Sequence, residues 1–497
     1  MNKPNKSSIW KSLDAQAQSV NLSIPKNSVQ SVTTKIKQNA SSCHINLDYS
    51  HQHITDDSLE LLIALTDTCQ LREKIQGLMR GDIVNNSEKR PALHTALRAP
   101  ADTSIWINGQ NIMDEIIATR AKMQAIAEQV RNKDWLGYSG KPITDIVNIG
   151  IGGSDLGPRF CVDALAEHTS ADFKYHFISD VDPNSFKQVA SQLKPDTTLF
   201  IVSSKSFTTQ ETLYNARKAM AWIGEQQRHQ QHFIAVTANI EKAQQFGIQN
   251  TLPIWSWVGG RYSFCSAVNL ITAIAIGYDK FNQILNGANS MDKHFHDSEF
   301  SSNLPVLLGL IGIWNNNFLN THNLLLLTYA LQLKQFVPYI QQLDMESNGK
   351  SIDKQGNAVN HATGPLIWGG LGNQAQHSYY QLLCQGTHKV TVDFISLHAF
   401  ADEIINDMCH AKINTLSNGI NDQTNLNGFI PGNIALNHLS IQDASPFTIG
   451  ALVALYEHKI FTQSVIWDIN PFDQPGVESA KRNITQRKAA EQSASMA

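Results

Sequence analysis

Residues 203–209 carry a high density of groups that bind anions. The segment, SSKSFTT, contains five hydroxyl side chains and one lysine. It follows a short apolar run, Leu199–Val202, that predicts a buried strand, and it precedes Gln210–Ile223, where apolar residues recur at helical spacing. Unpaired N–H groups and the positive end of the helix dipole lie at such a helix start. The segment therefore has the chemistry to hold a phosphate monoester.

The same residues also fit an ordinary helix cap. Thr208 and Glu211 have the spacing of a capping box, and serine and threonine are common residues at helix starts. This stretch taken alone leaves both interpretations open.

Two further stretches contain charged side chains beside turn residues. Arg261 follows two glycines in VGGRYSFCSAVN, and a permanently charged guanidinium can stabilise a developing oxyanion. Glu346 ends an apolar run just before Ser-Asn-Gly, and a desolvated carboxylate can act as a proton-transfer base near neutral pH. A surface arginine beside a turn and a solvated glutamate are the plain alternatives.

The last third of the chain supplies another pair of candidates. His377 follows the glycine-rich loop WGGLGNQAQ and is predicted to start a helix, although most single histidines are structural. In FDQPGVESAK a loop ends at Gln474 to Gly476, and a helix is predicted from Val477. Lys481 then lies in its first turns, where the helix dipole disfavours a cation, which weakly suggests a functional lysine.

A glycine loop follows the first strand of a predicted sheet. Residues 145–157 read DIVNIGIGGSDLG, which invites a dinucleotide-binding interpretation. However, Asp155 occupies the place of the third glycine of G-x-G-x-x-G, and a carboxylate there is poor for holding a pyrophosphate. An NAD-dependent dehydrogenase is therefore disfavoured. Gly153 and Ser154 could still approach a small polar ligand, or the loop could be only a tight strand-to-helix turn.

Composition excludes several classes of protein. The net charge of −4 gives no reason to expect nucleic acid or an acidic membrane as a partner. The six cysteines are scattered, which fits a reducing cytoplasm, and the polar N-terminus shows no secretory signal. The sequence contains no H-E-x-x-H motif and no clustered cysteine and histidine set, so no metal site stands out, and it contains no G-x-S-x-G motif of a serine nucleophile.

These candidates must be positioned by an α/β scaffold. Short β-rich runs separated by helical segments predict a doubly wound parallel sheet, with strands at 146–151, 175–178, 199–202 and 233–236. Other expected elements are helices at 57–79, 112–133, 303–318, 321–335 and 447–461, and a strand at 390–395. A chain of 497 residues is too long for one core. We expect an N-terminal helical segment (1–110), a first α/β domain with the phosphate site (111–278) and a second α/β domain with the C-terminal segment (279–497).

Taken together, the motifs resemble those of the phosphoglucose isomerase family. NIGIGGSDLGP, SSKSFTTQET, GGRYS, MESNGK, the His377 segment and FDQPGVESAK occur in the family's order, between about residues 50 and 482. The resemblance implies two sugar-isomerase (SIS) α/β/α sandwich domains with parallel-rich sheets, plus N-terminal helices and a C-terminal helical segment. It also implies reversible conversion of D-glucose 6-phosphate to D-fructose 6-phosphate, in glycolysis and gluconeogenesis, without a metal or nucleotide cofactor. A homodimer would share its active sites across the interface.

The resemblance also implies roles for particular residues. Glu346 would move a proton between C1 and C2, and Arg261 would stabilise the cis-enediolate between them. His377 and Lys481 would move the protons that open the sugar ring. The phosphate would be held by Ser204, Ser206 and Thr209, together with the backbone of Lys205 and nearby groups. The sugar or its phosphate would also contact Gly153, Ser154, Gln342 and Gln474.

The sequence departs from the family pattern at two places, and two alternative functions are still compatible with it. Ser206 stands where the family commonly has threonine, and GLGNQAQ (370–376) replaces a loop that the family often writes EPGTNGQ. A non-catalytic SIS module that binds a sugar phosphate to regulate another process needs the phosphate site, but it does not need Glu346, Arg261, His377 and Lys481 together. An isomerase that also accepts mannose 6-phosphate is equally compatible with these residues.

Overall fold

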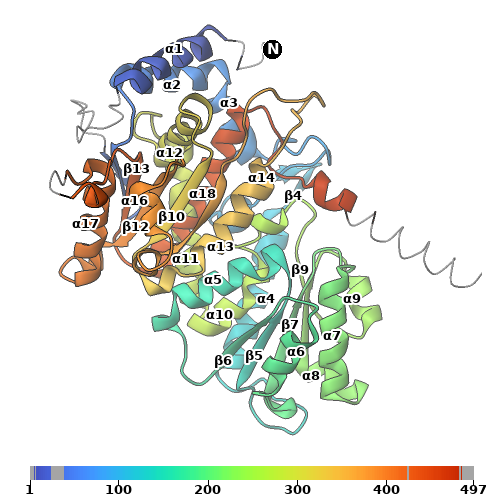
Figure 1. The fold of residues 1–497 in the computed structure, drawn as a ribbon. Coiled ribbons are helices and arrows are strands. Elements are labelled where there is room, and N and C mark those ends of the chain that lie inside the picture. The colour runs from blue at the N-terminus through green and yellow to red at the C-terminus, as the bar shows by residue number, and fades with distance from the viewer. Residues whose placement is uncertain (1–4, 6, 24–38, 422–424, 481–482, 484–497) are drawn as a thin grey trace, which may run out of the picture.

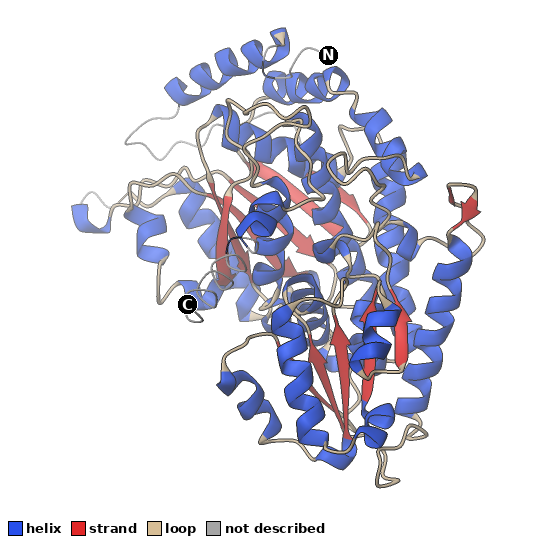
Figure 2. Ribbon diagram, turned by 90° about the vertical axis from the view of Figure 1, so that its right-hand side faces the viewer, coloured by secondary structure: helices blue, strands red, loops and turns tan. Residues whose placement is uncertain are grey.

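Two separate β-sheets, each flanked by helices, organise the chain (Figures 1 and 2). The computed structural model describes residues 5, 7–23, 39–421, 425–480 and 483. One sheet takes all its strands from residues 145–253, and the other takes four from 323–441 and two from near the N-terminus. The predicted α/β class with two parallel-rich sheets is confirmed.

The first sheet is parallel throughout and carries two of the loops that the sequence singled out as candidates for binding. Its strand order is β6 (Lys174–Ile178), β5 (Asp145–Ile149), β7 (Thr198–Ser203), β8 (Phe233–Thr237) and β9 (Asn250–Pro253). Every residue of β5, β7 and β8 is buried, as expected for parallel strands covered on both faces. Because β5 and β7 are neighbours, the loops that follow them meet at the carboxyl edge of the sheet.

Helices on both sides cover this sheet. They include α4 (Met113–Arg131), α5 (Leu156–Ala164), α6 (Pro183–Ala190), α7 (Gln210–Ile223), α8 (His229–His232), α9 (Ile240–Phe246) and α10 (Leu270–Ile276). The predicted bounds of α7 are confirmed, and the helix expected at 112–133 is confirmed with small end differences.

The second sheet is mixed because the N-terminal part of the chain joins it. Its order is β1 (Asn39–Ser42), β2 (Ile45–His51), β13 (Leu436–Ile441), β12 (Thr391–Leu397), β10 (Asn323–Thr328) and β11 (Leu366–Leu371). The last four strands are parallel, whereas β2 runs antiparallel to both β13 and β1. The description of residues 1–110 as a helical segment is therefore incomplete, because residues 39–51 are strands of this sheet; the domain boundaries stay a prediction.

The helix expected at 321–335 is wrong. Residues 323–328 form strand β10, and a 3₁₀ turn follows at Leu331–Leu333. The run LLLL lies between two parallel partners and is buried on both faces, so its apolar residues carry no period that separates a strand from a buried helix.

The long helix α18 (Pro446–Ile466) passes through the middle of the molecule (Figure 1). All its residues except Phe447 are buried, and it packs against α11 (Tyr278–Asp297) and α12 (Leu304–Ile313). A π-helical turn, Trp314–Phe318, continues α12. The helices predicted at 303–318 and 447–461 are thus confirmed. Helices on the other side of the second sheet include α16 (Tyr380–Gln385) and α17 (Ile404–Asn418).

The N-terminal helices are α1 (Ser8–Ser23), α2 (Asp56–Thr68) and α3 (Leu71–Arg80). The single helix expected at 57–79 is wrong, because Gln70 adopts a left-handed backbone conformation with φ of 54°. A residue in that conformation ends one helix before the next begins. No helix in the described part of the chain combines the length and the apolar character needed to cross a membrane.

Candidate active site

Arg261 is a buried cation that the fold holds in a fixed orientation. It lies on a 3₁₀ turn (Gly260–Tyr262), and only 2% of its surface is exposed. Its Nε donates to Ser347 Oγ (2.6 Å) and its Nη1 to Gln474 Oε1 (3.1 Å). Its Nη2 donates to the carbonyls of Pro471 and Asp473. These partners come from segments more than 80 residues away, so the guanidinium joins three parts of the chain.

Glu346 lies next to this arginine. The π-helical turn Gln341–Met345 leads directly into the short helix α14 (Glu346–Asn348). Glu346 Oε2 is 3.6 Å from Arg261 Nη1 and accepts a hydrogen bond from Gln342 Nε2 (3.0 Å). The carboxylate side chain is 23% exposed. The structure thus brings together Arg261, Glu346, Gln342 and Gln474, which the sequence placed in three separate motifs.

The glycine loop after β5 touches the turn that carries Arg261. A Cβ atom on Gly153 would lie 2.0 Å from the Gly260 carbonyl oxygen, and one on Gly152 would lie 2.8 Å from Gln342 Nε2. Gly152 also has a φ of 59°, in the left-handed region that favours glycine. These glycines therefore allow two loops to approach closely. Ser154, at the end of this turn, carries the hydroxyl of the loop and is partly buried.

A cavity of about 640 Å³ opens beside these groups. Its lining includes Glu346, Lys350, Asp473, Gln474 and Val477. The carboxylate and the glutamine that hold Arg261 therefore face a space large enough for a small molecule. The hydroxyl loop at 203–209 lies outside this cavity.

The hydroxyl loop lies between β7 and α7, as predicted, but the capping box is wrong. Thr209, not Thr208, is the N-cap residue of α7, and its side chain makes no capping hydrogen bond. Instead Ser204 Oγ donates to Thr209 Oγ1 (3.2 Å), and Ser206 Oγ and Thr208 Oγ1 pair at 2.6 Å. The hydroxyls therefore bond to one another and leave the start of this 14-residue helix available to an anion.

Lys205 connects this loop to the segment that precedes Arg261. Its Nζ donates to the carbonyls of Ser256 (2.7 Å) and Val258 (2.6 Å). Burial lowers the pKa of Lys205 to about 8, with a further contribution from the positive charge of Arg90. The ammonium is thus held against the backbone of a neighbouring loop, three residues before Arg261.

The two ring-opening candidates, His377 and Lys481, are not part of the Arg261–Glu346 cluster in the described structure. His377 is exposed on the turn between α15 (Gly372–Ala375) and α16, so the expected helix start there is wrong. Within the described part of the chain, no hydrogen bond or ion pair joins it to Glu346 or Arg261. Lys481 lies outside the described residues. The segment 370–376 spans the end of β11 and helix α15, and Gly372 packs against the ring of Tyr329.

Sequence reasoning missed three neighbours of this cluster. Ser347 accepts the Nε hydrogen of Arg261, and Tyr262 OH lies 3.0 Å from the same Ser347 oxygen. Lys350 Nζ donates to the carbonyls of Glu346 (2.9 Å) and Ser347 (2.8 Å). Burial, together with the charge of Arg261, lowers the pKa of Lys350 to about 8. The only signal was position, because each lies within four residues of a candidate.

No group of three or more histidine, cysteine, aspartate or glutamate side chains in the described ranges is arranged to hold a metal ion. The polar groups gathered here are instead a carboxylate, a guanidinium, amides and hydroxyls. Such a set can move a proton and stabilise an anion.

Comparison with known proteins shows the family of the chain. Residues 48–496 match the family model described as phosphoglucose isomerase. The chain belongs to the phosphoglucose isomerase family. A glucose-6-phosphate isomerase of Legionella pneumophila (strain Lens) is 62% identical over 441 residues, which cover 88% of each chain. One from Shewanella baltica (strain OS223) is 44% identical over 476 residues, covering 90% of this chain and 87% of that protein.

A crystal structure supports the same assignment. The glucose-6-phosphate isomerase from Chlamydia trachomatis superposes with a TM-score of 0.89 at 30% sequence identity, covering 99% of this chain and 97% of that one. The phosphoglucose isomerase family resemblance noted from six short motifs therefore extends over nearly the whole fold.

Proposed function

We propose that this protein is a glucose-6-phosphate isomerase that interconverts D-glucose 6-phosphate and D-fructose 6-phosphate. The observation that carries the proposal is the buried Arg261, whose Nη1 lies 3.6 Å from the Glu346 carboxylate at the edge of a cavity. Removing a proton next to a carbonyl needs a base and a fixed positive charge near the oxygen that becomes negative. This pair meets both needs.

Glu346 is the proposed proton carrier. In the open-chain aldose it takes the proton from C2, and the C2 electron pair forms the C1–C2 double bond while O1 becomes an enediolate oxygen. A proton then passes from O2 to O1, and the same carboxyl returns its own proton to C1, so that O2 becomes the carbonyl oxygen of the ketose. Arg261 stabilises the intermediate's negative charge, and the hydrogen bond from Gln342 holds the carboxylate between the two carbons. Gln474 orients the guanidinium and reaches the sugar from the cavity wall.

Ring opening precedes this step, because the closed hemiacetal has no acidified C2 proton. We assign it to His377 and Lys481, which move protons at the ring oxygen and O1. The exposure of His377 supports a homodimer in which the partner subunit supplies this histidine to the site.

The proposed location of the enzyme is the cytoplasm, and its proposed pathways are glycolysis and gluconeogenesis.

The phosphate is the proposed anchor at the non-reacting end of the sugar. The uncapped start of α7 and the hydroxyls of Ser204, Ser206 and Thr209 support this assignment, with Ser154 on the adjacent loop. Binding energy from this end positions C1 and C2 against Glu346.

The test is direct. The purified protein, without added metal or nucleotide, is incubated with fructose 6-phosphate, and quenched samples are assayed for glucose 6-phosphate with glucose-6-phosphate dehydrogenase. Turnover is the expected result. Binding of the sugar phosphate without turnover would instead favour a non-catalytic regulatory module. Mannose 6-phosphate in the same assay measures any side activity.

A further inference from the structure

Nearly all hydrogen-bonding capacity of the Arg261 guanidinium is used by the protein itself. An arginine side chain has five N–H donors in a rigid plane. Here Nε–H is bound by Ser347, one Nη1–H by Gln474, and the two Nη2 hydrogens by the carbonyls of Pro471 and Asp473. The remaining Nη1–H is on the side of Glu346. The orientation of this last donor therefore depends on the groups that hold the other four.

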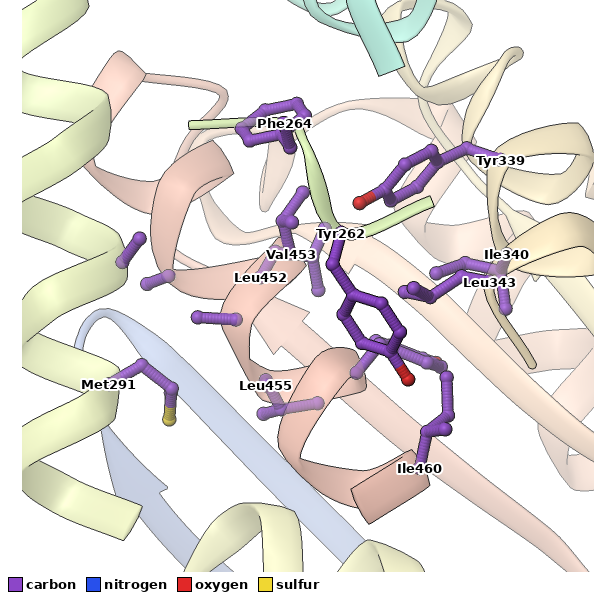
Figure 3. Close-up of a cluster of buried hydrophobic side chains, with 14 of the residues drawn as sticks. Tyr262, Phe264, Met291, Tyr339, Ile340, Leu343, Leu452, Val453, Leu455 and Ile460 are labelled. Atoms are coloured by element: carbon purple, nitrogen blue, oxygen red, sulfur yellow. The ribbon is translucent and has the colours of Figure 1, made fainter. Parts of the chain in front are cut away.

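Ser347 is the one side-chain hydroxyl among those holders, and it is itself held. Its Oγ accepts from Arg261 and lies 3.0 Å from Tyr262 OH, and both residues are buried. Figure 3 shows Tyr262 inside the buried cluster that also contains Tyr339, Leu343 and Leu455. The Tyr262 ring also packs against His94 and Phe472. Tyr262 therefore has little freedom to move away from the serine.

Ser347 also follows Glu346 directly in the chain. The acceptor that orients the arginine and the carboxylate that faces it thus lie on one short turn, α14. Lys350 closes this turn by donating to the carbonyls of both residues. Any displacement of the turn moves the base and the arginine's anchor together.

We propose that Ser347 and Tyr262 are positioning residues for Arg261: Tyr262 fixes the Ser347 hydroxyl, and Ser347 fixes the guanidinium so that its free Nη1–H points at the C1–C2 oxygens. This proposal rests on the proposed isomerase function. The two residues do not touch the substrate, and they act only through the arginine.

The first experiment compares two substitutions of buried serines. Ser347→Ala removes the acceptor for Arg261 Nε, and we expect kcat to fall roughly 10- to 100-fold, somewhat less than the loss of a whole oxyanion donor, with KM changing less than about threefold. Ser464→Ala is the matched control, because Ser464 is equally buried and its hydroxyl donates to the Phe461 carbonyl within α18. It should keep wild-type kcat. Ser347→Thr, which keeps a hydroxyl, should recover most of the rate.

The second experiment is a double-mutant cycle. Tyr262→Phe keeps the ring and removes the hydroxyl, and we expect kcat to fall roughly 3- to 10-fold. In the Ser347→Ala background the same change should have almost no further effect on kcat, because Tyr262 acts through Ser347. Additive losses would overturn the proposed relay and leave Tyr262 as a packing residue.

A binding measurement separates positioning from general damage. Arabinonate 5-phosphate carries a carboxylate where the enediolate forms, whereas glucitol 6-phosphate is neutral there. Ser347→Ala should weaken the first ligand roughly tenfold and leave the second unchanged. Equal weakening of both, or unchanged kcat, would overturn the proposal. If the wild-type protein binds glucitol 6-phosphate but turns over no substrate, the proposed isomerase function is wrong, and this inference is wrong with it. If the wild-type protein turns over substrate and the variants are unaffected, only this inference is wrong.

Discussion

The Arg261–Glu346 cluster and the 203–209 hydroxyl loop are built on opposite principles. Arg261 is 2% exposed, and protein groups from two distant segments, Ser347 and residues 471–474, use four of its five donors. In the loop, Ser206 and Thr208 are exposed, and the hydroxyl hydrogen bonds recorded there join loop residues to one another.

The difference fits what each region is proposed to bind. Charge that develops during a reaction is stabilised best by donors that are already in place and need no reorganisation. A phosphate is charged before it arrives, so the loop only needs donors that can exchange a hydroxyl partner for a phosphate oxygen. In the proposed function, rigid donors serve the reacting end of the sugar and exchangeable donors serve its phosphate anchor. The predictions below test this division.

The largest effect is expected at Glu346. Glu346→Gln keeps the shape and the contact with Gln342 but removes the base, so kcat should fall by about 10²–10⁴-fold while fructose 6-phosphate still binds. Exchange of the C2 proton with deuterated water, followed by NMR, measures the loss directly. Glu241→Gln, an exposed glutamate on α9, is the control and should exchange normally. Persistent exchange in Glu346→Gln would mean that another group is the base.

Arg261→Lys should come next. Lysine keeps the charge, but it lacks the planar fork that serves Ser347, Gln474 and the two carbonyls together. We expect kcat to fall by about 10²–10³-fold, with a small change in KM. Steady-state kinetics decide the matter, and a near-normal kcat would show that charge alone, without fixed orientation, is sufficient at this end of the site.

A smaller effect, of a different kind, is expected in the hydroxyl loop. Ser206→Ala should raise KM roughly tenfold, the value of one hydrogen bond to a charged group, and leave kcat within about twofold. Thermal shift with inorganic phosphate should show the same loss of affinity. Ser191→Ala, an exposed serine at the end of α6, serves as control. A fall in kcat without a change in KM would contradict the division between anchor and reacting end.

The smallest effect concerns Lys205, which connects the two regions. Its pKa of about 8 means that the free protein loses this positive charge in the hydroxyl loop as the pH rises through about 8. The Lys205→Arg variant stays charged over this pH range and serves as the reference. We expect kcat/KM of the wild-type protein to decline about threefold more than that of the variant as the pH rises. Profiles of the two proteins measured from pH 6.5 to 9.5 test this. Identical profiles would show that the Lys205 charge does not act on the phosphate.

Much of this architecture was predictable because local patterns and tertiary structure agree. The strands β5, β7 and β8 are short, fully buried runs rich in apolar residues, and α7 has a clear helical period. Prediction failed where the pattern carried no period, as in the leucines of β10, or where one residue changed the backbone, as Gln70 does between α2 and α3.

Some residues of the candidate site could likewise be predicted from the sequence, and others could not. Residue type identified Arg261 and Glu346 as candidates, since few side chains offer a permanent cation or a tunable base. The serine that orients the arginine could not be found, because Ser347 has an ordinary side chain and acquires its role only from the 2.6 Å contact with a residue 86 positions away. The predicted capping role of Thr208 was wrong for a related reason, since its hydroxyl pairs with Ser206 and does not cap the helix.

The antiparallel pairing of β2 with β13 also has a consequence for how the protein is made. Ile45 pairs with Ile441 and Leu47 with Leu439, so the second sheet joins parts of the chain that leave the ribosome far apart in time. The first sheet needs only residues 145–253 and can form early in synthesis. Strand β2 must wait for nearly the whole chain, with a large loop-closure cost. The first sheet, with its hydroxyl loop, is therefore expected to form before the second sheet is complete.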